Sequence, residues 1–187
     1  MVSVFASTAF LLSSPAFAGT SDADALKPWT AAAPPPVRLP QLGSPHSSLF
    51  AVAGQPADVI VLHFFASWCE PCREELPALK RLSDRGAPRL KVVAIAVADN
   101  EGRLRRVIET TGVTFPVLMD RDRVVARDWS ISALPSTVIL DSRHAPRLIA
   151  ETEVAWDSLD PKRLLDRLSA PENDVHVRQP TKNQGRQ

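Results

Sequence analysis

The sequence predicts an α/β protein, in which a central β-sheet is covered by helices on both faces. Two observations carry this prediction. Apolar strand-like runs alternate along the chain with segments of helical periodicity, and the most apolar run, from Val59 to Phe65, has His63 as its only polar residue. A run of this kind is typical of a strand that is buried on both faces. We therefore expect residues 59–65 to lie in the centre of the sheet.

The segments after this strand alternate in type. A helix is expected over about 71–83, where Leu76, Leu79 and Leu82 are spaced to share one face. In chain order, the remaining predicted elements are a strand at 90–98, a helix carrying Leu104, Val107 and Ile108, a strand at 115–119, one or two helical turns at 124–129, a strand at 137–140, an edge strand at 147–151 and an amphipathic helix at 157–168.

The length of 187 residues fits one domain that buries a core, which we expect at residues 46–170. Lysine and arginine number 22 against 21 acidic residues, so the chain has no strong positive field. Nucleic acid is therefore not an expected partner.

The two ends of the chain differ in composition from this domain. Residues 1–18 are expected to be a signal peptide, because a short apolar stretch is followed by Ala16-Phe17-Ala18, the spacing that a signal peptidase accepts. The first basic residue is Lys27, so the charge that usually precedes the apolar stretch is absent. Residues 19–45, rich in proline and alanine, predict an extended linker without buried side chains. Residues 171–187 predict a disordered tail.

The two cysteines of the chain lie in Trp68-Cys69-Glu70-Pro71-Cys72, directly after the central strand and at the start of a helix. Side chains at positions i and i+3 lie on one helix face, within reach of a disulfide. The free N–H groups at the helix N-terminus stabilise a thiolate, which makes Cys69 the expected nucleophile. Cys72, one turn inside, is expected to resolve the mixed disulfide. The motif therefore predicts thiol-disulfide exchange.

Other interpretations of the cysteine pair have weaker support. No zinc site is expected, because there is no further cysteine and the histidines at 46, 63, 144 and 176 lack ligand spacing. A structural disulfide closing so short a loop would stabilise little. A peroxiredoxin would need a threonine two or three residues before its reactive cysteine, where this chain has Ala66 and Ser67. A metallochaperone that binds Cu(I) through the two thiols remains the alternative function.

These motifs resemble those of a known family, the exported bacterial thiol-disulfide oxidoreductases of the TlpA and ResA type. The resemblance covers about residues 59–168. It rests on the segment from Leu62 to Pro77 with its Cys-Glu-Pro-Cys motif, on Gly112 to Val117, and on Leu134 to Thr137. It implies a thioredoxin-like fold, with a central mixed β-sheet flanked by helices and the TlpA-type central insertion.

The resemblance also implies roles for single residues. Leu134 and Pro135 would form a cis-proline loop that faces the nucleophile and pairs with the backbone of the substrate. Trp68 and Pro71 would contact the substrate beside them.

Two further residues lie near the motif. Glu75 matches a family glutamate that influences the titration of the cysteines, the alternative being a solvated carboxylate in the first helical turn. His63 stands where thioredoxins carry aspartate and the TlpA type often asparagine. Its imidazole either relays a proton to Cys72 or is a hydrogen-bonded core residue.

The resemblance finally implies a setting for the chemistry. It implies a periplasmic enzyme, soluble or membrane-tethered, that reduces disulfides in protein clients and needs no cofactor. Such enzymes serve cytochrome c maturation or copper-centre assembly and receive electrons from a membrane thiol reductase. The carboxyls of Glu70 and Glu75 near the cysteines favour this reducing direction.

Overall fold

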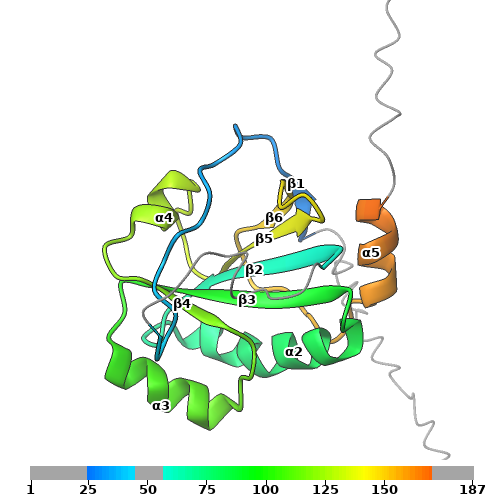
Figure 1. Cartoon of the computed structure of the whole chain (residues 1–187). Coiled ribbons are helices and arrows are strands. Elements are labelled where there is room, and N and C mark those ends of the chain that lie inside the picture. The colour runs from blue at the N-terminus through cyan, green and yellow to red at the C-terminus, as the bar shows by residue number, and fades with distance from the viewer. Residues whose placement is uncertain (1–24, 45–56, 170–187) are drawn as a thin grey trace, which may run out of the picture.

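The centre of the molecule is a six-stranded mixed sheet of order β1-β6-β5-β2-β3-β4 (Figure 1). The structure, a computed structural model, describes residues 25–44 and 57–169. Strand β2 (Val59–Phe65) runs parallel to β3 (Leu90–Val97) and antiparallel to β5 (Ser136–Asp141). All seven residues of β2 are buried. The prediction of a central strand at 59–65 is confirmed.

The outer strands complete the sheet on both sides. Strand β4 (Val117–Asp120) pairs in parallel with β3. On the other side, β6 (Pro146–Ala150) pairs antiparallel with β5, and the short β1 (Lys27–Pro28) pairs antiparallel with β6. The prediction that residues 147–151 form an edge strand is therefore wrong, because the N-terminal segment supplies a further strand.

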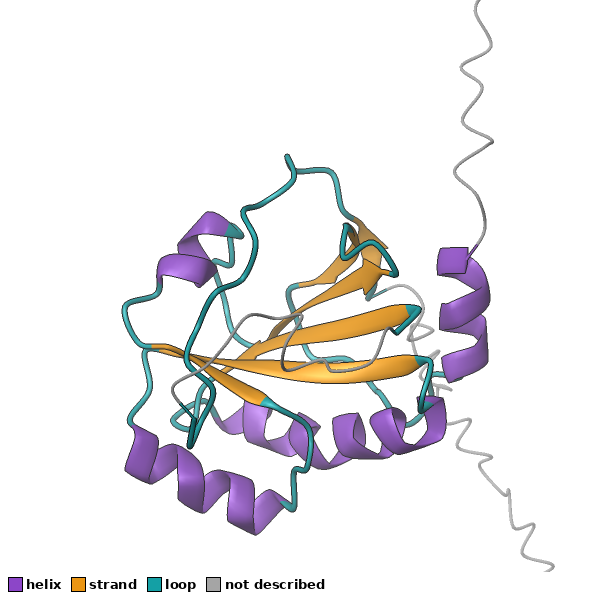
Figure 2. Cartoon of the chain, viewed as in Figure 1, coloured by secondary structure: helices purple, strands orange, loops and turns teal. Residues whose placement is uncertain are grey.

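Helices lie on both faces of the sheet (Figure 2). Helices α2 (Glu70–Gly86), α3 (Glu101–Thr111) and α5 (Pro161–Ser169) contribute buried leucines to the core on one face, which we call the α2 face. The short helix α4 (Val124–Asp128) packs on the opposite face, the α4 face. Both the predicted covering by helices and the alternation of strand and helix are confirmed.

Helix α5 begins later than the sequence analysis placed it, at Pro161 rather than at 157. The carboxylate of Asp160 accepts a hydrogen bond from the backbone N–H of Lys162 at 2.9 Å and so caps the first turn. Proline suits the first helical position, because its missing N–H would have no partner there. The Asp-Pro pair therefore fixes this helix start.

The Pro-rich segment 25–44 packs against the sheet, which corrects the expectation that it buries no side chains. Val37 and Leu39 are buried in the core of the α4 face, and the Trp129 indole N–H donates to the carbonyl of Pro35 at 3.2 Å. Leu26 is buried on the other face. Because Val37 and Leu39 are two residues apart in extended backbone, their side chains point to the same side.

This segment also pairs with the outer edge of β4. The N–H of Met119 donates to the carbonyl of Pro40, and the N–H of Leu42 donates to the carbonyl of Val117, both at 2.8 Å. An isolated bridge between Gln41 and Leu118 lies between these bonds. The N-terminal segment thus covers the free side of the last strand.

The predicted signal peptide at 1–18 and the predicted tail at 171–187 lie outside the described residues. In the part of the chain that the structure describes, no helix is long and apolar enough to cross a membrane. The domain boundaries and the central insertion stay predictions.

Candidate active site

The cysteine pair lies where strand β2 passes into helix α2. Cys69 is the N-cap residue of α2, and its sulfur accepts a hydrogen bond from the backbone N–H of Cys72 at 3.3 Å. The two residues form a disulfide, with their Cα atoms 5.3 Å apart. Cys69 keeps an exposed fraction of 7%, whereas Cys72 is fully buried. An attacking thiolate from another molecule therefore reaches Cys69 and not Cys72.

The loop before Cys69 is held by a buried carboxylate that the sequence analysis did not identify. Asp99 accepts hydrogen bonds from both the backbone N–H and the hydroxyl of Ser67, the latter at 2.6 Å. Both residues are buried. Asp99 follows β3 and Ser67 follows β2, and the carboxyl ends of these parallel strands meet at one edge of the sheet. Polar residues directly after two predicted parallel strands are the sequence signal that indicates such a contact.

The loop that the resemblance assigns to substrate binding lies beside the motif. The peptide bond between Leu134 and Pro135 is cis, which confirms the expected conformation. Leu134 is half-buried and packs against the core cluster that contains both cysteines, whereas Pro135 is buried. Both Trp68 and Leu134 line a cavity of about 190 Å³.

The structure thus brings two of the predicted substrate contacts together. The Trp68 side chain is 56% exposed, which is unusual for so large an apolar group. Pro71, also predicted to contact substrate, is half-buried in the first turn of α2 and does not line this cavity.

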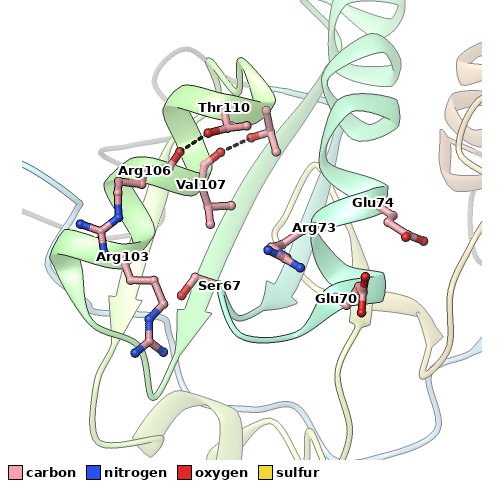
Figure 3. Close-up of a pocket in the computed structure, with 9 residues that line it drawn as sticks. Ser67, Glu70, Arg73, Glu74, Arg103, Arg106, Val107 and Thr110 are labelled. Atoms are coloured by element: carbon pink, nitrogen blue, oxygen red, sulfur yellow. Dashed lines mark hydrogen bonds between the residues drawn. The ribbon is translucent and has the colours of Figure 1, made fainter.

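A larger cavity, of about 460 Å³, lies between helices α2 and α3 and reaches the motif at Ser67 and Glu70 (Figure 3). Arg73 extends from α2 toward α3, and Arg103 lines the opposite wall. Glu74 points away from α3. Three arginines and two glutamates line this cavity, so the surface next to the disulfide carries charges of both signs.

Glu75 is buried on the α2 face, with an exposed fraction of 6%, so the alternative of a solvated carboxylate is wrong. Its Oε1 accepts a hydrogen bond from the backbone N–H of Val154. The pKa of Glu75 is raised to about 7, chiefly by burial and in smaller part by the charge of Glu153. The Val154 N–H lowers the pKa, as does the Trp156 indole, which lies near the carboxylate without hydrogen-bond geometry.

His63 is fully buried on the same face, where α2 covers β2. Its Nδ1 lies 2.9 Å from the hydroxyl oxygen of Thr137, and its Nε2 lies 3.8 Å from Oε2 of Glu75. Burial lowers the pKa of His63 to about 3, so the imidazole is neutral at neutral pH. The structure therefore confirms a hydrogen-bonded core histidine, and a proton relay to Cys72 stays a prediction.

Among the described residues, no three side chains of His, Cys, Asp or Glu gather as ligands for a metal ion. A copper site would therefore rest on the two sulfur atoms of the motif alone, and these are bonded to each other here.

Comparison with known proteins places these features in a family. The family model described as AhpC/TSA matches residues 32–145, more than half of the chain. This chain belongs to the AhpC/TSA family. Among relatives in Bacillus subtilis, the thioredoxin-like protein YneN is 35% identical over 112 residues, 58% of this chain and 64% of YneN. The thiol-disulfide oxidoreductase ResA is 31% identical over 86 residues, 44% of this chain and 46% of ResA.

The chain spans less than two thirds of the length of both relatives. A solved structure of a DsbF homologue from Corynebacterium diphtheriae matches the fold with a TM-score of 0.64 and 24% identity. That match covers 86% of this chain and 99% of the other. The predicted resemblance and the thioredoxin-like fold of this AhpC/TSA chain are confirmed.

Proposed function

We propose that this chain is an exported thiol-disulfide oxidoreductase that reduces disulfides in protein clients. The observation that carries the proposal is the disulfide between Cys69 and Cys72 at the start of α2, in which Cys69 keeps a small exposed fraction and Cys72 has none. The similarity to ResA, a thiol-disulfide oxidoreductase, supports it.

The reaction begins from the reduced dithiol. The Cys69 thiolate, stabilised by the helix N-terminus, attacks a disulfide sulfur of the client. The client disulfide breaks, one client sulfur leaves as a thiolate, and a mixed disulfide forms with Cys69. Cys72 then loses its proton and attacks Cys69, which releases the second client thiolate. The client gains two electrons, and the enzyme returns to the disulfide state.

A protein client fits the surface around Cys69 better than a small molecule does. The exposed Trp68 ring and the half-buried Leu134 line one cavity and offer apolar contact beside the sulfur. The backbone before Pro135 is the proposed partner for an extended client segment, by strand addition. Pro71 is proposed to contact the client from the start of the helix.

The finer parts of the proposal concern the setting. The signal-like residues 1–18 support export to the periplasm, as a soluble or membrane-tethered protein. The resemblance supports clients of cytochrome c maturation or copper-centre assembly, and a membrane thiol reductase as electron donor. Glu75 is proposed to influence the titration of the cysteines, because it follows Cys72 by one turn on the same buried helix face.

The test is to trap the client. In Cys72→Ser, no second thiol can resolve the mixed disulfide between Cys69 and the client. The variant should therefore accumulate mixed disulfides in the exporting cell. Non-reducing gels detect them, and mass spectrometry identifies the attached client. The Cys69→Ser/Cys72→Ser double variant is the control and should trap nothing. The proposal fails if the wild type, reduced with dithiothreitol, does not reduce insulin or another test disulfide.

The same protein samples separate this proposal from its alternatives. Equilibrium dialysis of the reduced protein against Cu(I) should show no tight binding, and a peroxide consumption assay should be negative. Tight Cu(I) binding without disulfide reduction would instead favour the metallochaperone.

A further inference from the structure

Three polar side chains interrupt the apolar core of the α2 face. His63 comes from β2, Thr137 from β5 and Glu75 from α2, and each has an exposed fraction of 6% or less. His63 and Thr137 are register partners on neighbouring antiparallel strands. The helix brings Glu75 over the imidazole, so the three side chains form a chain of polar groups between sheet and helix.

Two atoms of this cluster face each other without a hydrogen bond. Within the described residues, Nε2 of His63 and Oε2 of Glu75 have no hydrogen-bond partner, and they lie 3.8 Å apart. Buried polar atoms are nearly always paired. A small approach of one side chain would pair both atoms.

The hydrogen bond between Thr137 and His63 bears on which ring nitrogen carries the proton. In the described part of the chain, the buried hydroxyl of Thr137 has one hydrogen-bond partner, Nδ1 of His63 at 2.9 Å. A buried hydroxyl group needs an acceptor for its proton. If Thr137 donates to Nδ1, the proton of the neutral imidazole resides on Nε2, where it points at Glu75.

Few other charges act on this cluster. Glu153 lies in the loop after β6 and opposes ionisation of Glu75. Cys72 precedes Glu75 by one turn on α2, and its thiol is free only in the reduced state. The Val154 N–H occupies the other carboxylate oxygen. The Trp156 indole N–H also lacks a hydrogen-bond partner among the described residues, and it lowers the pKa of Glu75. Within that part of the chain, His63 and Trp156 are therefore the unpaired donors near the Glu75 carboxylate.

We propose that His63 is a positioning residue that directs an Nε2–H at Glu75 and so allows this buried carboxyl to ionise behind the disulfide. Thr137 holds the required tautomer. Without this donor, Oε2 would lose the Nε2–H that faces it, and the Trp156 indole would be left to offset its negative charge.

The consequence for exchange rests on the proposed function. When Cys72 attacks the mixed disulfide, its thiol proton passes to the Glu75 carboxylate, directly or through water. The sulfur electron pair forms the bond to Cys69, and the client sulfur leaves as a thiolate that takes a proton from solvent. During reduction of the enzyme, Glu75 returns its proton to the departing Cys72 sulfur. Sulfur, electrons and protons balance at each step.

The test uses the oxidised full-length protein, in which the cysteines do not titrate. The ¹³C signal of the Glu75 carboxyl is followed from pH 4 to 10, and Glu75→Gln identifies it. In His63→Leu the midpoint should rise by one pH unit or more, a tenfold fall in the acid dissociation constant. In His63→Asn, whose amide can still donate, the midpoint should stay within about half a unit of the wild type.

The tautomer is measured independently by the ¹⁵N shifts of His63. The wild type should carry its proton on Nε2. Thr137→Val removes the hydroxyl but keeps the shape, and should give a mixture of tautomers and a raised Glu75 midpoint, whereas Thr137→Ser should match the wild type. This second variant carries the test if leucine at position 63 prevents folding.

Two results would overturn the inference. One is a neutral wild-type imidazole that carries its proton on Nδ1. The other is a titration midpoint of Glu75 that stays unchanged in both His63→Leu and Thr137→Val. Both are observed in the disulfide form without any client, so they do not depend on exchange activity. Conversely, loss of insulin reduction in the wild type would remove the proposed function and leave the NMR result standing.

Discussion

The two faces of the sheet differ in what covers them and in what they bury. On the α4 face, strand β2 contributes Ile60, Leu62 and Phe64, and a short helix together with the N-terminal segment covers them. On the α2 face, the same strand places His63 among apolar neighbours, under a long helix whose first turn holds the disulfide. The α4 face is an apolar core in which the buried carboxylate of Asp120 accepts hydrogen bonds from the backbone of α4, and the α2 face combines core and chemistry.

This difference shows how a single strand serves two purposes. Alternate side chains of a strand point to opposite faces, so the residues that hold the fold together are separated from those that titrate. We expect variants on the α4 face to change stability without changing its pH dependence. Variants on the α2 face should change both.

The largest effect on stability is expected on the α4 face. Phe64 is fully buried and packs against Trp129, with ring centroids 6.2 Å apart. Phe64→Ala should lower the free energy of unfolding by about 3–5 kcal/mol, because it removes a large core side chain and leaves a cavity. Urea unfolding at pH 5 and pH 7.5 should give the same loss. If the loss in free energy of unfolding depended on pH, the proposed difference between the two faces would be wrong. Phe64→Leu is a milder variant for the same measurement.

The next effect is the pH dependence of the α2 face. Burial raises the pKa of Glu75 from 4.5 to about 7 and lowers the pKa of His63 from 6.5 to about 3. Between pH 4.5 and 6.5 the unfolded chain carries a charged imidazole and a charged carboxylate, whereas the folded pair is neutral. Both states then bind one proton, so this pair should leave the stability of the wild type flat in that window.

Single variants should expose the two opposing slopes. In His63→Asn only the raised carboxyl remains, so stability present below pH 4.5 is lost as the pH rises to 7, by about 3 kcal/mol. In Glu75→Gln only the lowered imidazole remains, so stability present above pH 6.5 is lost as the pH falls, by about 3 kcal/mol at pH 4.5. Urea unfolding across pH 4.5–7.5 measures both. Parallel profiles in the two variants would contradict the assignment.

The smallest effect concerns the N-terminal segment on the α4 face. Trp129→Phe removes the N–H that donates to the Pro35 carbonyl but keeps an aromatic ring in the core. The free energy of unfolding should fall by about 1 kcal/mol. Amide exchange of Met119, which donates to Pro40, should become faster. Unchanged exchange would mean that the segment is held by its other contacts.

Much of the fold and the core of the site could be predicted from the sequence, because their signals are local. The apolar run of β2 indicates a strand buried on both faces, and the cysteines directly after it mark the start of α2. The packing of Val37 and Leu39 also had a local signal, since they alternate with Arg38 and Pro40. The proline content around them obscured it.

Other parts of the site depend on contacts between distant segments. Thr137 meets His63 only because β5 pairs with β2, and Trp156 comes near Glu75 from a loop after the last strand. No periodicity of the sequence marks such pairs. The burial of Glu75 likewise follows from its helix face and from the loop at Val154 that covers it, not from its neighbours in the chain.

The pairing of the N-terminal segment with β4 has a consequence for association. The bonds of Pro40 and Leu42 occupy backbone groups on the free side of β4. An uncovered edge strand is a template on which a second molecule can add a strand and begin a fibril. A protease that removes the chain up to residue 44 would uncover this edge. By covering the edge of β4, the N-terminal segment therefore prevents a second molecule from adding a strand there.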